Sequence, residues 1–263
     1  MRNVTSMKEL KRLLSYTRRA VDDYAMIEDG DKIAVGVSAG KDSLALFYAL
    51  AQMRRFYPKK YDLIAITVDM GFPNTSFDGI KALCESLDVE YHIAPTQIYQ
   101  IIFEERKEKS PCSLCAKMRR GVLYNTAKEL GCNKVALGHH FDDAIETFML
   151  NLFFEGRIGC FSPVTYLSRI DLTMIRPLLY ASEKSVRQFA DKAELPVVKS
   201  TCPADGNTER EEMKQLLHEL DVKHKGLRYR IFGAMQRGEI DGFKVASSMD
   251  GIKDYDNEND ENE

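Results

Sequence analysis

One short run in the chain combines small residues, two hydroxyl groups and a cation. It lies between an apolar stretch that predicts a strand and another that predicts a helix, and reads Ser38, Ala39, Gly40, Lys41, Asp42 and Ser43. A helix N-terminus offers unpaired N–H groups and a partial positive charge, and small residues let an anion approach the backbone. The run therefore predicts a phosphate site. The alternative is an ordinary strand–helix turn capped by Ser43.

The spacing of this run excludes a Walker A loop. Three residues separate Gly36 from Gly40 where Walker A has four, and Asp42 follows the lysine in place of Ser or Thr. The run resembles instead the Ser-Gly-Gly-x-Asp-Ser PP-loop of the N-type ATP pyrophosphatases, with Ala39 in place of the usual glycine. Those enzymes cleave ATP to AMP and pyrophosphate while they adenylate a substrate. The match assumes a negative φ at Ala39, where alanine costs little.

Two cysteines with C-x-x-C spacing, Cys112 and Cys115, lie at the start of a predicted helix. Their thiolates can reach one metal ion or cluster, and a helix N-terminus lowers thiol pKa values. Half of a zinc site, a redox dithiol and part of an iron–sulfur site all fit this spacing. Cys202 is the other cysteine in a loop rich in glycine and proline. The remaining cysteines are predicted to be structural: Cys84, Cys132 and Cys160.

Several segments together resemble the tRNA 2-thiocytidine synthetases, the TtcA group of PP-loop enzymes. They are Cys112-Ser-Leu-Cys115-Ala-Lys-Met-Arg119-Arg120-Gly121, residues 136–147 with Gly-His-His-x-Asp-Asp, residues 26–31 and residues 175–178. The resemblance runs from about residue 10 to residue 235. It implies a 4Fe–4S cluster held by Cys112, Cys115 and Cys202, with one iron left open to sulfide or substrate. The Cys-Pro-Ala-Asp-Gly setting of Cys202 departs from the commoner segment and leaves the substrate open.

The resemblance also implies a reaction and a set of site residues. ATP would adenylate the oxygen at C2 of a cytidine in a tRNA anticodon loop, sulfur would replace that oxygen, and AMP would leave. The implied ATP- and Mg²⁺-binding residues are Ser38, Ala39, Gly40, Lys41, Asp42, Ser43, Asp69, Gly138 and His139.

Catalytic roles are predicted for Lys41 and for Asp143, the latter as a metal ligand or acid/base group, with Asp142 as its alternative. The Asp142/Asp143 pair would equally suit the dipole of a helix N-terminus. Arg119 and Arg120 are predicted to meet RNA phosphate, the alternative being a solvated face.

Short apolar strands alternate with helices along the chain, which predicts an α/β fold. The expected strands are 32–37, 61–69, 89–94, 134–138 and 173–178, and residues 196–199 form a short extended piece. The expected helices are 4–27, 44–56, 75–87, 97–109, 112–130, 140–154, 182–193 and 209–236, the last with breaks near Gly226 and Gly233. We expect a parallel sheet of about five strands with helices on both faces, as in PP-loop ATPases of the adenine nucleotide alpha-hydrolase-like fold. Ser38, Asp69 and His139 each follow a predicted strand, which favours one shared site.

The domain organisation follows from composition. Residues 1–30 are predicted to be an N-terminal helix packed on the core, residues 31–247 the PP-loop domain with the cysteines, and residues 248–263 a disordered acidic tail. The tail region 249–263 holds seven acidic residues and one lysine, a net charge of −6, so the rest carries +3 against the total of −3. A mildly basic body permits contact with nucleic acid.

The overall composition, 44% hydrophobic and 29% charged, is that of a soluble globular protein. No run approaches the roughly 20 apolar residues that span a membrane, and the N-terminal segment lacks an apolar secretory core. We therefore expect a cytoplasmic protein whose cysteines are reduced or metal-bound.

The partners that the resemblance implies are tRNA, a sulfur donor such as a cysteine desulfurase or free sulfide, and a second copy in a homodimer. Three alternatives stay open: thiolation of uridine or a small molecule, amine ligation as in lysidine synthesis, and a non-catalytic nucleotide and cluster sensor.

Overall fold

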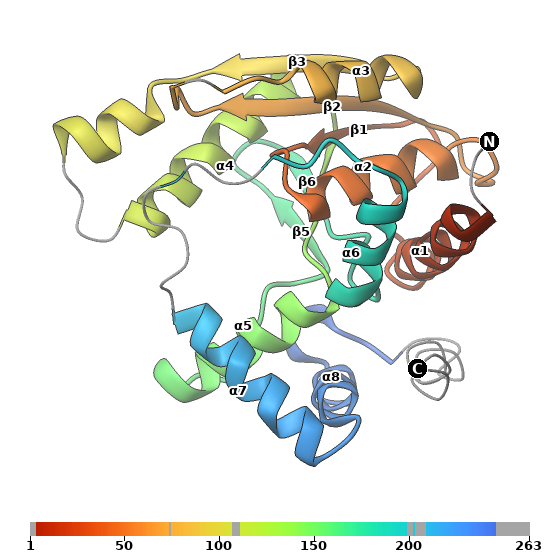
Figure 1. Ribbon diagram of the computed structural model, residues 1–263, viewed down its shortest axis with the longest axis vertical. Helices are drawn as coiled ribbons and strands as arrows, with labels where there is room; N and C mark the ends of the chain where they lie inside the picture. The colour runs from red at the N-terminus through yellow and green to blue at the C-terminus, as the bar shows by residue number, and fades with distance from the viewer. Residues whose placement is uncertain (1–3, 74, 107–110, 199–201, 203–208, 246–263) are drawn as a thin grey trace.

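A computed structural model describes residues 4–73, 75–106, 111–198, 202 and 209–245 of the 263-residue chain. It is an α/β fold around one six-stranded sheet with the order β3-β2-β1-β4-β6-β5 (Figure 1). The strands are β1 Asp31–Gly36, β2 Tyr61–Asp69, β3 Glu90–Pro95, β4 Lys134–Ala136, β5 Val164–Leu167 and β6 Leu172–Ile175. All neighbours pair in parallel except β5 and β6, which are antiparallel.

The helices lie on both faces of the sheet and at its lower end. They are α1 Val4–Asp23, α2 Lys41–Met53, α3 Asp78–Ser86, α4 Pro111–Glu129, α5 Phe141–Phe154, α6 Glu183–Lys192, α7 Glu209–Lys223 and α8 Leu227–Arg237, with a π-helical turn η1 Gln100–Glu105 and a 3₁₀ turn η2 Ile240–Gly242. Within these described residues, no helix is both long and apolar enough to cross a membrane.

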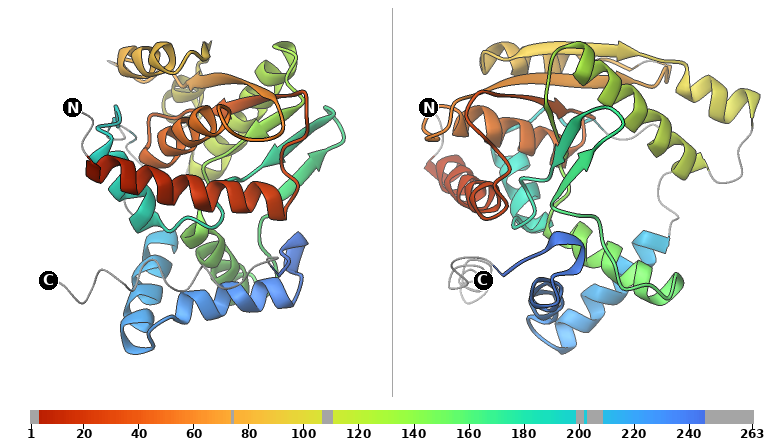
Figure 2. Two further views of the ribbon diagram at one scale, coloured as in Figure 1. Left: turned by 90° about the vertical axis from the view of Figure 1, so that its right-hand side faces the viewer. Right: turned by 180° about the vertical axis from the view of Figure 1, so that it is seen from behind.

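Alternation along the central strands creates two apolar layers. In β1, Ile33 and Val35 join the large core that includes α1, α2 and α6, whereas Ala34 faces the smaller core under α4. Successive side chains of a strand point to opposite faces, so a strand covered on both sides must be apolar throughout. Figure 2 shows α4 crossing the back of the sheet, opposite α1, α2 and α6.

The expected parallel α/β sheet with helices on both faces is confirmed, with one addition. Strand β5 was expected to be loop, and its antiparallel pairing with β6 extends the sheet by one edge strand. Three of its four residues are half-buried and Tyr166 is exposed, so the pattern is too short to separate from a loop.

Several predicted boundaries were wrong. Helix α1 ends at Asp23, before the left-handed Ala25 (φ 47°). The helix expected from residue 97 is the turn η1, and the break expected at Gly233 does not occur, because that glycine is buried inside α8. The extended piece at 196–198 pairs with no described strand. The rest of that piece, most of the loop after Cys202 and the acidic tail lie outside the described residues.

The strand order reverses between β1 and β4. Strands that leave such a point in opposite directions open a crevice at their carboxyl ends, where ligands bind in open α/β sheets. Helices α5, α7 and α8 pack together below this part of the sheet (Figure 1). Any site at the carboxyl ends of β1 and β4 is therefore bordered by these three helices.

Candidate active site

The predicted phosphate loop joins β1 to α2, as the sequence indicated. Ser43 fixes its shape: the Ser43 hydroxyl donates to the carbonyl of Gly40 (3.0 Å) and accepts from the amide of Ser38 (3.0 Å). Gly40 is the N-cap of α2, without a side-chain cap of its own. The first turn of α2, which includes Lys41, thus begins at the loop, three residues earlier than expected.

Ala39 does not have the negative φ that its match to the PP-loop assumed. Its φ is 61°, in the left-handed region where an L-residue costs about 1–2 kcal/mol per residue. Its carbonyl accepts a hydrogen bond from the amide of Val198 (3.0 Å), which ties the loop to the segment before Cys202. The position therefore has the backbone that suits glycine, and the chain holds an alanine in it.

The segment after β4 lies directly against the phosphate loop. A Cβ atom placed on Gly138 would come within 3.0 Å of the carbonyl carbon and oxygen of Asp42, which is tighter than most real Cβ contacts. A larger residue at position 138 would therefore require one of the two backbones to shift. Asp69, at the end of β2, holds its own loop instead, because its Oδ1 accepts from the amide of Gly71 (2.9 Å).

His139 is held by a buried arginine. Nε of Arg176 donates to Nδ1 of His139 (3.2 Å), and Phe161 stacks against both side chains. An imidazole that accepts at Nδ1 is neutral and carries its proton on Nε2. Burial, with the charge of Arg176, lowers the pKa of His139 to about 4. Burial also lowers the pKa of Arg176 to about 10.

His140 and Asp143 form the capping box that starts α5. The His140 imidazole accepts from the amide of Asp143, and Oδ2 of Asp143 accepts from the amide of His140 (2.9 Å). Asp142 joins three helices: its Oδ2 accepts from the amide of Glu183 in α6 (2.7 Å), and its Oδ1 pairs with Arg228 of α8 (2.6 Å). Both carboxylates thus have structural contacts at the α5 N-terminus.

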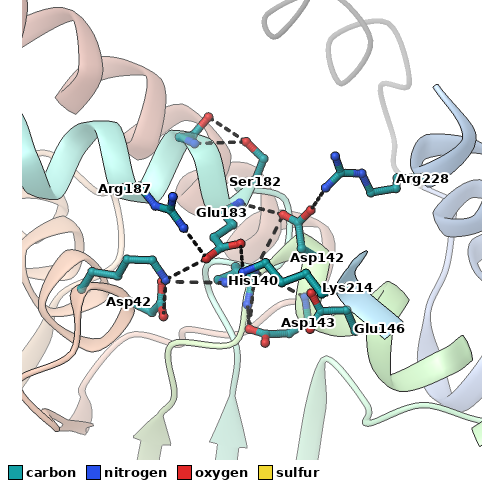
Figure 3. Close-up of polar contacts among 12 residues, drawn as sticks. Asp42, His140, Asp142, Asp143, Glu146, Ser182, Glu183, Arg187, Lys214 and Arg228 are labelled. Atoms are coloured by element: carbon teal, nitrogen blue, oxygen red, sulfur yellow. Dashed lines mark hydrogen bonds and ion pairs between the residues drawn. The ribbon is translucent and has the colours of Figure 1, made fainter. Parts of the chain in front are cut away.

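Lys41 of the phosphate loop lies between two carboxylates. Its Nζ is 3.0 Å from Oδ1 of Asp42 and 3.2 Å from Oε1 of Glu183. Glu183 also binds Lys214 of α7 (2.7 Å) and Arg187 (3.0 Å), as Figure 3 shows. Burial opposes ionisation of Glu183, but Lys214 and Lys41 outweigh it and lower its pKa to about 2. The loop lysine is therefore tied to α6 and, through Glu183, to α7.

Glu146 is a second carboxyl group one turn along α5. Burial, reinforced by the charge of Asp143, raises its pKa to about 7, although Arg210 of α7 lies 3.4 Å away and favours the charged form. Arg210 also reaches Oδ1 of Asp143 (3.2 Å). A carboxyl with a pKa near neutrality is suited to exchange a proton at working pH.

The predicted cysteine ligands gather at the start of α4. Cys115 is buried, and Cys112 and Cys202 are close enough to act electrostatically on its thiol. Burial raises the pKa of Cys115, Arg119 lowers it, and the other two thiols raise it further. Among the described side chains, no three from His, Cys, Asp or Glu are arranged to hold a metal ion directly.

Arg119 and Arg120 are both exposed on α4. Arg119 faces the Cys115 thiol, with which it has a hydrogen bond, whereas Nε of Arg120 bonds to the carbonyl of Ala116 within the helix (3.2 Å). Arg119 therefore lies beside the Cys115 thiol, whereas the guanidinium of Arg120 packs back on its own helix.

Sequence reasoning missed the charged residues that surround the phosphate loop and the start of α5. These are Glu183, Lys214, Arg210 and Arg228, with Arg176 after β6 and Glu146 in α5. Glu183 had a usable signal, an acid directly after the predicted N-cap Ser182, whose hydroxyl accepts from Ser185. The cations of α7 and α8 had none, because their positions depend on tertiary packing.

Comparison with known proteins defines the class. The profile of the PP-loop domain family matches residues 5–220, so the chain belongs to the PP-loop family. The resemblance of the run 38–43 to a PP-loop is confirmed.

Two relatives of the chain carry the same name. The tRNA-cytidine(32) 2-sulfurtransferase of Geobacter sulfurreducens is 41% identical over 86% of this chain and 89% of its own length. The enzyme of the same name from Pelobacter propionicus is 43% identical over 87% of both chains. The structure is also similar to U34-tRNA thiolase NcsA from Methanococcus maripaludis, solved with its 4Fe–4S cluster. The TM-score is 0.71 at 28% identity, over 85% of this chain and 77% of that one. The resemblance to the tRNA 2-thiocytidine synthetases is confirmed.

Proposed function

We propose that this protein is an ATP-dependent tRNA sulfurtransferase that converts a cytidine of the anticodon loop into 2-thiocytidine. The observation that carries the proposal is the gathering of Cys112 and Cys202 around Cys115, in a chain whose relatives at about 40% identity bear that activity in their names. Uridine as the acceptor is the second candidate, because the similar solved structure is a U34-tRNA thiolase.

The first half of the reaction is adenylation. Oxide is a poor leaving group, so the C2 oxygen of the base attacks the α-phosphorus of ATP, and pyrophosphate leaves. The start of α2 and the hydroxyls of Ser38 and Ser43 hold the phosphates. During the reaction Lys41 leaves Glu183 and pairs with the negative charge of the phosphates. Lys214 stays paired with Glu183 and neutralises it meanwhile. Oxyanion stabilisation of this kind is a large catalytic term.

Asp42 and Asp143 are the proposed ligands of Mg²⁺ at the phosphates. Asp42 lies beside Lys41, and the side chain of Asp143 is 21% exposed, against 6% for Asp142. His139 offers an Nε2–H to the nucleotide, since Arg176 occupies its other nitrogen. Carboxylates that solvent and ligands can reach are suitable ligands for a hard cation.

The second half of the reaction replaces oxygen by sulfur. A sulfur nucleophile forms a bond to C2, the C2–O bond breaks, and the oxygen leaves on AMP. The donor set suits an iron–sulfur cluster, because Cys112 and Cys202 lie near the thiol of Cys115, which is buried in an apolar cluster with Ile98 and Ile102. A 4Fe–4S cluster held by Cys112, Cys115 and Cys202 would supply the sulfur-transfer chemistry.

The proposal also covers the catalytic domain, the RNA contacts, the location in the cell, the sulfur donor and the oligomeric state. Residues 31–247 form the catalytic domain, Arg119 and Arg120 contact RNA phosphate, and the protein works in the cytoplasm. Free sulfide or a cysteine desulfurase provides the sulfur, and two copies form a homodimer.

The experiment is analysis of tRNA nucleosides by mass spectrometry from a deletion strain with and without the gene. Restoration of 2-thiocytidine supports the proposal, whereas 2-thiouridine would favour the second candidate, and unchanged nucleosides would remove both. In parallel, the anaerobically purified protein should hold about four irons. Cys115→Ser should lose them and Cys132→Ser, which removes a buried cysteine under α4, should not.

A further inference from the structure

Three aromatic side chains meet at the carboxyl ends of β2 and β3. Phe72 follows β2, Phe103 belongs to the π-helical turn η1 that follows β3, and Tyr99 is the residue directly before that turn. The ring centroids of Phe72 and Tyr99 are 4.9 Å apart, and those of Tyr99 and Phe103 are 5.5 Å apart. Phe72 and Phe103 are 6.3 Å apart, so each ring contacts both others. We call these three residues the aromatic platform.

The aromatic platform adjoins the cysteines. Phe103 packs on the small apolar cluster that contains Cys115, Ile98 and Ile102. The Cys115 thiol lies 3.7 Å from the sulfur of Met70, and the carbonyl of Met70 accepts from the amide of Tyr99 (2.8 Å). The aromatic platform and the Cys115 thiol therefore belong to one continuous packed unit.

The platform is held open to solvent rather than folded into the core. All three rings are half-buried. The Tyr99 hydroxyl makes no hydrogen bond to any residue that the structure describes. Tyr91, on the preceding strand, instead donates to Thr67 (2.9 Å). A π-helical turn is a rare backbone form found often at functional sites. Aromatic faces that reach solvent suit a flat ligand such as a nucleic-acid base.

Positive charge lies beside the platform on α4, which contacts η1. The first ten residues of α4, Pro111 to Arg120, contain three cations and no acid. Lys117, Arg119 and Arg120 are all exposed. On η1, the exposed Arg106 follows two exposed glutamates, so the positive charge beside the platform is that of α4. Cations beside stacked aromatic rings are the combination that binds single-stranded nucleic acid.

We propose that the aromatic platform stacks an unpaired base of the RNA substrate beside the cysteines, with Tyr99 as the main contact. This inference rests on the proposed function for its RNA. Bases of a loop can be splayed out and stacked on aromatic side chains, whereas paired bases cannot. The platform thus fixes which part of the anticodon loop reaches the cysteine site.

The test compares three variants of the full chain. Tyr99→Leu keeps apolar bulk and removes the ring, Tyr99→Phe keeps the ring, and Tyr166→Leu removes a tyrosine that is 62% exposed on β5, at the opposite edge of the sheet. Binding of a tRNA with cytidine at position 32 is measured, together with ATP affinity, iron content after anaerobic purification and Tm.

Tyr99→Leu should weaken RNA binding roughly tenfold, since stacking on one base is worth about that factor. Tyr99→Phe and Tyr166→Leu should bind RNA within about twofold of the unaltered protein. ATP affinity, iron content and Tm should stay unchanged in all three. Tyr99→Leu with normal RNA affinity would overturn the platform, and so would equal losses in Tyr99→Leu and Tyr99→Phe.

Failure of the platform is separable from failure of the proposed function. If the unaltered protein makes no thiolated nucleoside, the proposed function fails whatever the variants do. If Tyr99→Leu binds RNA normally but loses only the activity supported by a desulfurase, and not that supported by free sulfide, the rings contact the sulfur donor and the RNA proposal is wrong.

Discussion

Ala39 shows how one backbone angle shapes the phosphate loop. At φ 61° the residue carries a left-handed cost of about 1–2 kcal/mol that glycine would not carry. Mutation to glycine would remove that cost, but two other terms oppose the resulting gain in stability. A buried methyl contributes roughly 0.8 kcal/mol, and glycine adds about 0.4–1 kcal/mol of unfolded-state entropy.

Ala39→Gly should therefore change the free energy of unfolding by less than about 1 kcal/mol, because these terms offset. Ala34→Gly, in β1, is the matched control: its methyl is fully buried and its φ is not positive. That variant should lose about 1–2 kcal/mol. Urea unfolding of both variants gives the comparison. Equal losses at the two positions would show that Ala39 is not strained.

The contact between Arg176 and His139 predicts a protonation state. Arg176→Met removes a cation and the donor to Nδ1, so the pKa of His139 should rise from about 4 toward its ordinary value of 6.5. The chain has five histidines, which makes ¹⁵N-histidine NMR titration tractable. The His139 signal, assigned by its loss in His139→Gln, should also lose its fixed Nε2–H tautomer. An unchanged titration and tautomer would contradict the contact.

Glu146 predicts a pH dependence of stability. Its folded pKa of about 7 exceeds the ordinary value of 4.5, so the folded state binds this proton more tightly. The resulting stability is present below pH 4.5 and is lost as the pH rises through 7. Glu146→Gln removes that loss and should be more stable than the unaltered protein at pH 8, by roughly 1–3 kcal/mol. Urea unfolding at pH 5 and pH 8 measures it. Glu155→Gln, at an exposed carboxylate, is the control, and parallel pH curves for the Glu146 variant and the unaltered protein would refute the shift.

At the scale of elements, Asp142 connects α5, to which it belongs, with α6 and α8. Asp142→Asn keeps an acceptor for the amide of Glu183 but removes the charge that pairs with Arg228. Breaking a largely buried charge pair should lower the free energy of unfolding by about 2–4 kcal/mol. Arg187→Met, which breaks an exposed pair with Glu183, should cost under about 1 kcal/mol. Thermal unfolding compares the two variants. Similar Tm values would show that the pair of Asp142 and Arg228 does not stabilise the packing of the three helices.

The sequence predicted elements well where burial gave a clear period. Strand β2 has the predicted bounds, because its middle, Leu63 to Ile66, is apolar and contributes in turn to the two cores. The N-cap Ser182 was also correct, since a hydroxyl before a helix is a local signal. The short edge strand β5 and the π-helical turn η1 were missed, because four residues carry no period and a π-turn looks helical.

The site was predictable only where its residues follow strand ends. Gly138 meets the phosphate loop at Asp42 and Ser43 because parallel strands β1 and β4 are neighbours. Asp69 ends β2, the strand on the other side of β1, and its carboxylate closes a turn. The helices that deliver Lys214 and Arg228 return from the C-terminal part of the chain, and no local pattern records that return.

At the scale of the whole molecule, charge is divided unequally along the chain. The total of −3 hides an end segment, residues 249–263, with a net charge of −6 and a remainder of +3. A tethered anionic segment competes with RNA phosphate for the same cations, including those of α4. The rest of the chain should therefore bind RNA more strongly than the full chain's net charge of −3 would lead one to expect.

Changing the seven acidic residues of 249–263 to their amides tests this in a chain of unaltered length. RNA affinity should rise several-fold at low salt, and the gain should shrink as added salt screens both partners. A variant with the same tail residues in scrambled order keeps the charge and should bind as the unaltered protein does. Filter binding across a KCl series measures all three. A gain that persists at high salt, or one that the scrambled tail reproduces, would show that the tail acts through a specific contact and not through its charge.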